Sequence, residues 1–120
     1  MIGRAHRFHG YGSLRSVYQH GKTVRGSVLS LKYASRGQKP YRIAVVVSKK
    51  VHKSAVVRNR IRRRIYEICR KQEAVDLTGL DLVFTVFSDQ VAELEATKLQ
   101  QSVHVLLKKA TQTPVNRGII

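Results

Sequence analysis

One two-sided helix constrains the fold of this chain more than any other feature of its sequence. Residues 53–71 carry the longest helical pattern, and at about 100° per residue their apolar side chains fall within an arc of about 120°. These side chains are Val57, Ile61, Ile65, Ile68 and Cys69. Arginine and lysine occupy most of the remaining helix surface. Such a helix packs one stripe on a sheet and leaves its other side cationic.

The charge balance favours a polyanionic partner. The chain holds 23 Lys and Arg against 7 Asp and Glu, a formal net charge of +16, and its pI is near 10.9. A pI above about 9 with clustered Lys and Arg is typical of nucleic-acid binding. Solubility alone needs a net charge of only about 2–8, and a membrane surface would require a basic amphipathic helix with large exposed apolar residues. We therefore expect a nucleic acid and no membrane.

Length and composition predict one domain. The 120 residues, 42% of them hydrophobic, suffice for a modest core. We expect the domain to span residues 1–112, with 1–10 as an extended basic arm, and 113–120 to be a flexible tail. The single cysteine, Cys69, fits a reducing compartment. No secretory signal is visible, and the longest apolar run, 43–47, is too short to span a bilayer, so the expected location is the cytoplasm.

Hydrophobic periodicity predicts three helices and three strands. In chain order these are a helix at 11–20, strands at 24–33 and 41–48, a helix at 53–71, a strand at 80–87 and a helix at 91–110. The turn residues of 34–40 predict that the first two strands pair antiparallel. The β-branched run 43–47 is typical of a strand buried on both faces. The order αββαβα places helices and one small sheet in a pair of layers, an α+β fold.

Five arginines crowd the first half of the long helix. They are Arg58, Arg60, Arg62, Arg63 and Arg64. Pairs four residues apart, such as Arg58 and Arg62, repel by a few tenths of a kcal/mol, so folding gains nothing from the arrangement. A ligand lined with phosphates would gain, because guanidinium groups match phosphate oxygens two at a time. A merely solvated helix usually mixes charges, whereas Glu67 is the only acid between His52 and Lys71.

Asn59 interrupts this cationic run. Near a helix N-terminus it could serve as a local cap. It could instead offer a neutral amide to a hydrated cation or to a backbone hydroxyl. The pattern favours the two interpretations equally.

The segments around this helix resemble one protein family. Val47-Ser-Lys-Lys-Val51, followed by an Ala-Val-Val-Arg-Asn-Arg stretch that begins at Ala55, is similar to the signature of the bacterial ribonuclease P protein family. There, a buried strand ending in Ser-Lys-Lys runs into a helix that opens with Arg-Asn-Arg. Flanking matches extend the resemblance over about residues 4–110. They are Arg7-Phe8, Val17-Tyr18 before Gly21, and Asp81 at the start of a strand.

The resemblance implies a fold and a function. The fold would be the family's α+β sandwich with a left-handed βαβ crossover through the long helix. The helix would face the catalytic RNA of ribonuclease P, which would perform magnesium-dependent removal of the 5′ leader of precursor tRNA. The protein, monomeric in the holoenzyme, would be inactive alone and hold no metal. The expected RNA-binding residues are Lys49, Lys50, Lys53, Arg58, Asn59, Arg60, Arg62, Arg63, Arg64 and Arg70.

The leader would lie in a cleft between the first helix and the sheet. Single-stranded nucleic acid is held by base stacking on aromatic rings and by cations along its backbone. The candidates are Tyr18 and Lys32, with Phe8 a weaker one. Tyr18 could equally be a core residue, because a helical tyrosine beside a sheet is often one.

The chain departs from the family pattern twice, and two other functions compete. His52-Lys53-Ser54 replaces the usual Gly-Asn, and Phe87-Ser88 stands where the family often has Arg. Another basic RNA-binding protein, such as a ribosomal protein, shares the charge but does not call for this motif. A nuclease in its own right would need convergent carboxylates. The candidates Glu67, Glu73, Asp76, Asp81 and Asp89 show no paired spacing.

Overall fold

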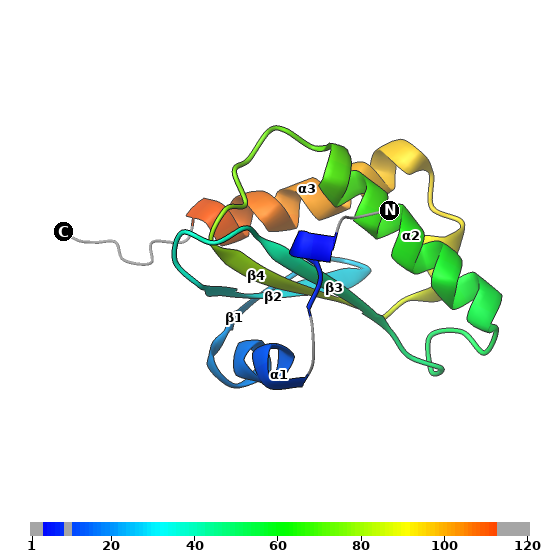
Figure 1. Cartoon of the computed structure of the whole chain (residues 1–120). Coiled ribbons are helices and arrows are strands. Elements are labelled where there is room, and N and C mark those ends of the chain that lie inside the picture. Colours follow the sequence, from blue (N-terminus) through cyan, green and yellow to red (C-terminus); the bar gives the residue numbers. More distant parts are fainter. Residues whose placement is uncertain (1–3, 9–10, 113–120) are drawn as a thin grey trace.

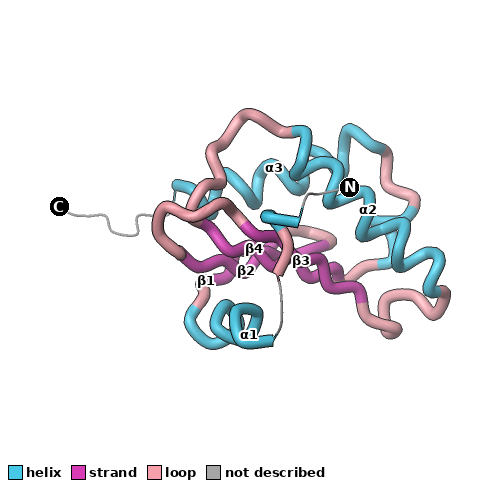
Figure 2. Tube along the Cα trace, viewed as in Figure 1, coloured by secondary structure: helices cyan, strands magenta, loops and turns pink. Residues whose placement is uncertain are grey.

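Figure 1 shows the computed structural model of the chain, which describes residues 4–8 and 11–112. Its elements are η1 (Arg4–His6), α1 (Tyr11–His20), β1 (Lys22–Arg25), β2 (Leu29–Ser35), β3 (Arg42–Val47), α2 (Ala55–Lys71), β4 (Leu80–Val86), η2 (Asp89–Ala92) and α3 (Ala96–Gln112), where η marks a 3-10 helix. Figure 2 shows how helices and strands alternate along the trace. The α+β class is confirmed, and the expected tail at 113–120 lies outside the described residues. In the described part of the chain, no helix combines the length and apolarity needed to cross a membrane.

The four strands form one mixed sheet in the order β1-β2-β4-β3. β4 pairs antiparallel with β2 and parallel with β3. The predicted antiparallel pairing across the 34–40 turn is therefore wrong, because β4 inserts between the two strands. β4 also carries the run that is buried on both faces, from Asp81 to Phe84, whereas residues of the edge strand β3 alternate between buried and half-buried.

The segment 24–33 is two strands, not one. β1 and β2 pair antiparallel, and the Gly26 N–H donates to the Leu29 carbonyl oxygen at 2.9 Å to close the turn between them. A Cβ at Gly26 would lie 3.1 Å from that same oxygen, so the glycine permits the close approach. Leu29, Leu31 and Tyr33 share one face of β2, and all three are buried.

Helices cover both faces of the sheet. α2 and α3 lie on one face, and α1 lies on the other against β2 and β4, so the molecule has three layers instead of the predicted pair. In Figure 1, β3 runs from left to right nearest the viewer with α2 above it, and the parallel strand β4 lies behind. The β3–α2–β4 crossover is therefore left-handed, as the resemblance implied, although roughly 98% of such connections are right-handed.

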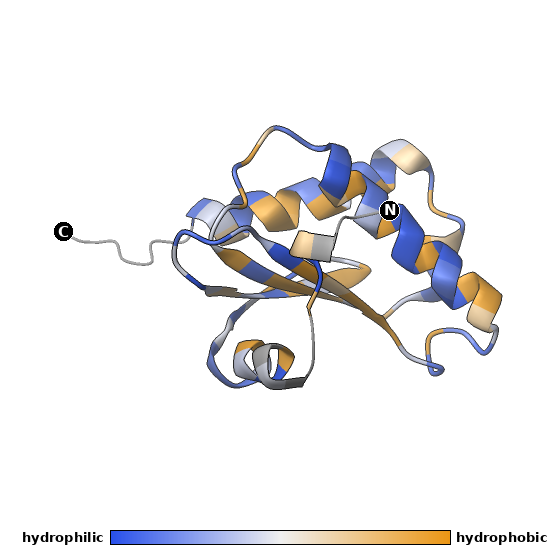
Figure 3. Ribbon diagram, viewed as in Figure 1, coloured by the Kyte–Doolittle hydropathy of each residue, from blue (hydrophilic) through white to orange (hydrophobic). Residues whose placement is uncertain are grey.

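The main core lies beneath α2 and α3. The sheet register aligns the buried side chains of Leu31, Phe84 and Val45 across β2, β4 and β3. The helices add Ile61, Ile65, Cys69, Leu99, Val103, Leu106 and Leu107. Figure 3 shows these apolar stripes turned toward the sheet and the hydrophilic sides turned outward. Three residues of the predicted apolar stripe on α2, Ile61, Ile65 and Cys69, are buried, which confirms its centre. Burial also raises the pKa of the Cys69 thiol to about 12.

The last helix begins later than its periodicity predicted. α3 starts at Ala96, and the expected start at Val91 falls in the 3-10 helix η2. The Ser88 hydroxyl oxygen caps η2 by accepting from the Gln90 N–H at 3.2 Å. Val91 is fully buried, so it fits the apolar pattern of a helix that faces the core, although it lies in a 3-10 helix and not in α3.

A partly buried ion-pair network ties the start of β4 to β3. Arg42 donates to Asp81 from Nε at 2.8 Å and from Nη2 at 2.7 Å, and the Arg36 Nε lies 3.4 Å from the same carboxylate. The Arg36 N–H donates to the Gly79 carbonyl, and the Gly79 N–H donates to the Lys39 carbonyl. Gly79 has a φ of 85°, and a Cβ there would overlap the carbonyl of the 36–40 loop.

The N-terminal segment docks on the outer edge of β3. The His6 ring stacks on Tyr41 with centroids 3.9 Å apart, and its Nδ1 lies 2.9 Å from the Tyr41 carbonyl oxygen. Arg7 forms a parallel bridge with Ile43. Residues 4–8 are therefore not the extended arm predicted from their lack of periodicity. Covering an edge strand in this way blocks pairing with another chain.

Candidate nucleic-acid interface

The loop that enters α2 is held by side chains of the loop itself and of the first turns of the helix, and within it the Ser54 N–H donates to His52 Nδ1 at 3.0 Å. The Ser54 hydroxyl oxygen caps the helix by accepting from the Val57 N–H at 3.3 Å. Arg58 Nη1 donates to the carbonyl oxygens of His52, at 3.0 Å, and Lys53, at 2.8 Å. The longer His52-Lys53-Ser54 entry is thus closed by Arg58, and Ser54 is the cap. The capping interpretation of Asn59 is wrong.

The middle of α2 forms a hollow lined by Asn59, Arg62, Arg63 and Tyr66. Arg62 Nη1 donates to the Asn59 Oδ1 at 2.6 Å, and its Nη2 lies 3.4 Å from the Val47 carbonyl oxygen. Asn59 therefore orients Arg62. The exposed Arg63 has no side-chain partner among the residues that the structure describes. The hollow thus combines an oriented guanidinium, a free one and a neutral amide.

Tyr66 closes the hollow and was missed by the sequence reasoning. Its hydroxyl oxygen accepts from the Val45 N–H at 3.3 Å, which leaves the hydroxyl hydrogen to donate to a ligand. Burial raises the Tyr66 pKa, so the group stays protonated. The available signal was spacing, because Tyr66 lies one helical turn after Arg62.

The predicted RNA-binding residues fall into two groups. One group surrounds the hollow or the loop before it: Lys49, Lys50, Lys53, Arg58, Asn59, Arg62 and Arg63. The other three do not line the hollow: Arg60 and Arg64 lie on other sides of α2, and Arg70 lies one turn after Tyr66 on the same side. Arg64 donates to the carbonyl oxygens of Val91, Ala92 and Leu94, which fixes η2 to α2. Arg60 lies 3.8 Å from Glu93, and Arg70 pairs with Glu67 at 2.7 Å.

A second cationic and aromatic surface lies on the opposite face of the sheet, beside α1. The Lys32 Nζ lies 5.8 Å from the centroid of the Tyr18 ring, and Tyr18 is 43% exposed, so it is not a core residue. The third predicted residue, Phe8, lies at the β3 edge, 4.9 Å from the Arg42 guanidinium. Arg42 was missed, although its alternation with Ala44 and Val46 places it on this face.

Sequence comparisons agree on one family. Its sequence model, described as Ribonuclease P, matches residues 2–111. The chain belongs to the ribonuclease P protein family. A ribonuclease P protein component of Chloroflexus aurantiacus is 35% identical over 111 residues, covering 92% of this chain and 82% of the relative. Another, from Caldanaerobacter subterraneus, is 38% identical over 95 residues, covering 79% and 80%.

Solved ribonuclease P proteins share the fold. The Staphylococcus aureus protein superposes with a TM-score of 0.76 at 23% identity, over 89% of this chain and 96% of its own. The Thermotoga maritima protein gives a TM-score of 0.76 at 22% identity, over 86% and 96%. At these identities the likeness shows the fold alone. It confirms the sandwich that the resemblance implied.

The carboxylates of this ribonuclease P protein are dispersed. Asp81 pairs with two arginines, and Glu67 pairs with Arg70 and Lys71. Across residues 4–8 and 11–112, no three His, Cys, Asp or Glu side chains gather in a group that could hold a metal ion.

We expect alanine variants to map the α2 surface of the ribonuclease P protein. Arg62→Ala and Arg63→Ala should each weaken RNA binding by ~1–3 kcal/mol, as for a lost hydrogen bond to a charged group. Each should also lower the salt dependence, because fewer phosphates are neutralised. Arg58→Ala should weaken RNA binding by a similar amount, and it should also loosen the 52–54 loop, because two hydrogen bonds to that loop are lost. Equilibrium binding to ribonuclease P RNA at several salt concentrations measures both quantities.

The matched control is Lys108→Ala, which removes an exposed cation from α3, on another part of the surface. Arg63→Ala is the cleanest of the test variants, because Arg63 holds no other described residue in place. Equal losses at Arg63 and Lys108 would indicate attraction by diffuse charge and contradict a defined surface.

Proposed function

We propose that this chain acts as a protein subunit of ribonuclease P that binds the catalytic RNA through the α2 surface. The observation that supports this most is the hollow of Asn59, Arg62, Arg63 and Tyr66, which follows the Ser-Lys-Lys turn in a member of this family. Two guanidinium groups can each give paired donors to phosphate oxygens. Asn59 and Tyr66 supply neutral donors suited to ribose hydroxyls. The loop lysines Lys49 and Lys50, both exposed, extend the cationic surface beyond the helix.

The α1 side of the sheet is proposed to hold the single-stranded 5′ leader of precursor tRNA. Tyr18 would stack on a base, and Lys32 beside it would neutralise a phosphate. Phe8, held beside Arg42 at the β3 edge, would offer a further ring. The two surfaces lie on opposite faces of the sheet, so one monomer could contact the catalytic RNA and the leader at once.

The chemistry in this proposal belongs to the RNA subunit. Magnesium bound to that RNA would activate the water that cleaves the leader, and the protein would lower phosphate repulsion between the RNA partners. The dispersed carboxylates support this division, because Asp81 and Glu67 are both engaged by arginines. The protein alone is then expected to be inactive.

Reconstitution with a bacterial ribonuclease P RNA tests the proposed function. We expect the protein to raise cleavage of precursor tRNA most at low magnesium, because its cations replace part of the metal requirement. The difference in cleavage between RNA with the protein and RNA alone should become smaller as the magnesium concentration rises. Cleavage by the RNA-free protein would contradict the proposal. Copurification with ribosomal RNA in place of one structured RNA would favour the alternative, a different basic RNA-binding protein.

A further inference from the structure

Three aromatic rings in the described part of the chain lie beneath a cationic side chain, and all three pairs lie on the α1 side of the sheet. The pairs are Phe8 with Arg42, Tyr18 with Lys32, and Phe87 with Arg25. The register places Lys32, Arg42 and Arg25 on the face opposite Leu31, Phe84 and Val45. The first two pairs belong to the proposed leader surface. The third has no role in it.

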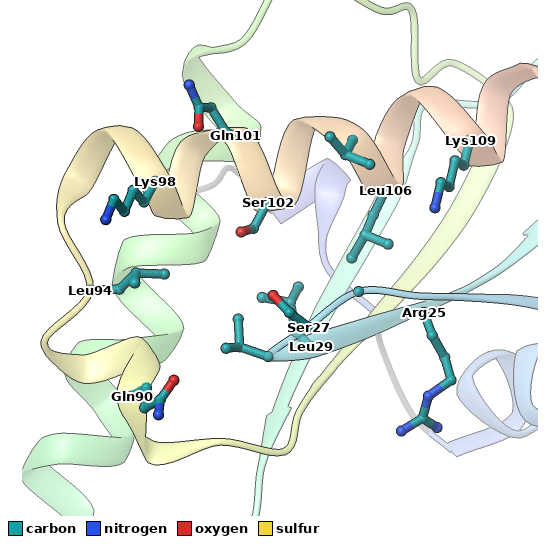
Figure 4. A pocket seen from close by; sticks show the side chains of 13 residues that line it. Arg25, Ser27, Leu29, Gln90, Leu94, Lys98, Gln101, Ser102, Leu106 and Lys109 are labelled. Carbon is teal, nitrogen blue, oxygen red and sulfur yellow. The ribbon is translucent and has the colours of Figure 1, made fainter.

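The third pair is exposed and held in place. The Arg25 guanidinium lies 5.0 Å from the centroid of the Phe87 ring, and Phe87 is 42% exposed. The Phe87 N–H donates to the Val28 carbonyl oxygen at 3.1 Å, which fixes the backbone just past the end of β4. Figure 4 shows the recess between α3 and the β1–β2 turn, where the Arg25 side chain points away from α3. Arg25 lines the edge of this recess, while the sheet register and its contact with Phe87 place both side chains on the α1 side of the sheet, with the leader surface.

The sheet connects this pair to the rest of the leader surface. Arg25, Ser30, Thr85 and Val46 occupy one row across β1, β2, β4 and β3, the row next to Lys32. Ser30, Thr85 and Val46 are half-buried, and two of them carry hydroxyl groups. Arg25 and Lys32 lie on neighbouring strands two residues out of register, so their Cα atoms are roughly 8 Å apart. Lys32, Arg25 and the Ser30 and Thr85 hydroxyl groups thus lie on the same face of the sheet as Tyr18 and Phe87.

We propose that Phe87 and Arg25 form a third base-stacking position for the single-stranded leader. The inference rests on the proposed leader surface and extends it to the far end of the sheet. A base would stack on the Phe87 ring, while Arg25 would bind the adjoining phosphate or cover the base from its other side. The ordinary alternative is a surface cation–π contact, which stabilises the fold slightly and contributes nothing to binding.

A thermodynamic cycle between protein and leader tests the proposal. Holoenzyme reconstituted with wild-type protein or with Phe87→Ala is titrated with precursor tRNAs in which one leader nucleotide at a time lacks its base. With wild-type protein, removing the stacked base should weaken binding roughly fivefold to a hundredfold. With Phe87→Ala, removing that same base should not weaken binding further, and removing any other leader base should weaken binding as much as it does with the wild-type protein. Tyr18→Ala should couple to a different nucleotide.

Further variants separate stacking from structure. Phe87→Tyr keeps an aromatic ring and should retain the coupling, and Arg25→Gln should lower the salt slope of leader binding by about 0.7. The control is Val105→Ala, which truncates an exposed apolar residue on α3 and should leave every leader position unchanged. Coupling at Tyr18 but at no position for Phe87 would overturn the third stacking position alone. If wild-type binding ignored every missing base, the proposed leader surface would itself fail.

Discussion

Replacing Asp81 with asparagine should lower the free energy of unfolding by about 3 kcal/mol. Asp81 is 6% exposed and accepts two hydrogen bonds from Arg42, while Arg36 lies 3.4 Å away. The hydrogen bonds to Asp81 are also the main cause of the raised Arg42 pKa. Breaking a buried ion pair typically costs 3–5 kcal/mol, because the remaining charge stays uncompensated. We expect a loss at the lower end of this range, because the Arg42 and Arg36 side chains are 17% and 19% exposed and remain in contact with water.

Urea unfolding at constant slope measures this loss, which is large against the 5–15 kcal/mol typical of a small domain. The control is a double-mutant cycle with Arg42→Met. Removing both partners leaves no charge unpaired at β3, so the double variant should be more stable than the sum of the single losses predicts. Additive losses, within about 0.5 kcal/mol, would show that the pair contributes nothing beyond its separate side chains.

The bounds of α1 and α2 were predictable because their signals are local, whereas α3 begins five residues later than predicted. α1 has the predicted bounds, and α2 begins two residues later than predicted, after the Ser54 cap. Apolar spacing and a stop or cap residue determine where each of these two helices begins and ends. The strand order was not predictable in this way. β4 follows α2 in the chain, yet it lies between β2 and β3, and no local pattern announces that placement. The reversal at Gly26 left only a weak signal, because the apolar positions merely change from even numbers, such as Val24, to odd numbers, such as Leu31, across the turn.

In the candidate site, too, the local pattern was predictable, and the position of each side chain relative to distant elements was not. The arginine cluster was predictable from the sequence, but the different positions of Arg63 and Arg64 were not. One residue rotates a helical side chain by about 100°, so Arg63 is exposed beside the hollow while Arg64 binds the carbonyl oxygens around η2. Which of them can reach RNA depends on where η2 packs. Likewise, Phe87 was visible as a departure from the family pattern, but its partner Arg25 comes from a different strand.

The free protein should be stabilised by sulfate more than by chloride. A net charge of +16 on 120 residues places several like charges within one Debye length, about 10 Å at 0.1 M salt. The α2 arginines concentrate this repulsion, and their described partners are mostly neutral carbonyl and amide oxygens. Any salt screens such charges. Sulfate also offers paired oxygens to Arg62 and Arg63, so it should bind the folded hollow better than the unfolded chain.

Mass action gives the expected size of the sulfate effect. A ligand that binds only the folded form adds ~2.7 kcal/mol at a hundredfold excess over its Kd, which corresponds to a rise in Tm of about 10 °C for a domain of this size. Thermal melts in sodium sulfate and in sodium chloride at matched ionic strength measure the difference. The Arg62→Ala/Arg63→Ala variant should lose the sulfate-specific part and keep the screening part, whereas Lys108→Ala should keep both. Identical wild-type melts in the two salts would leave only screening, and the hollow would then not be an anion site.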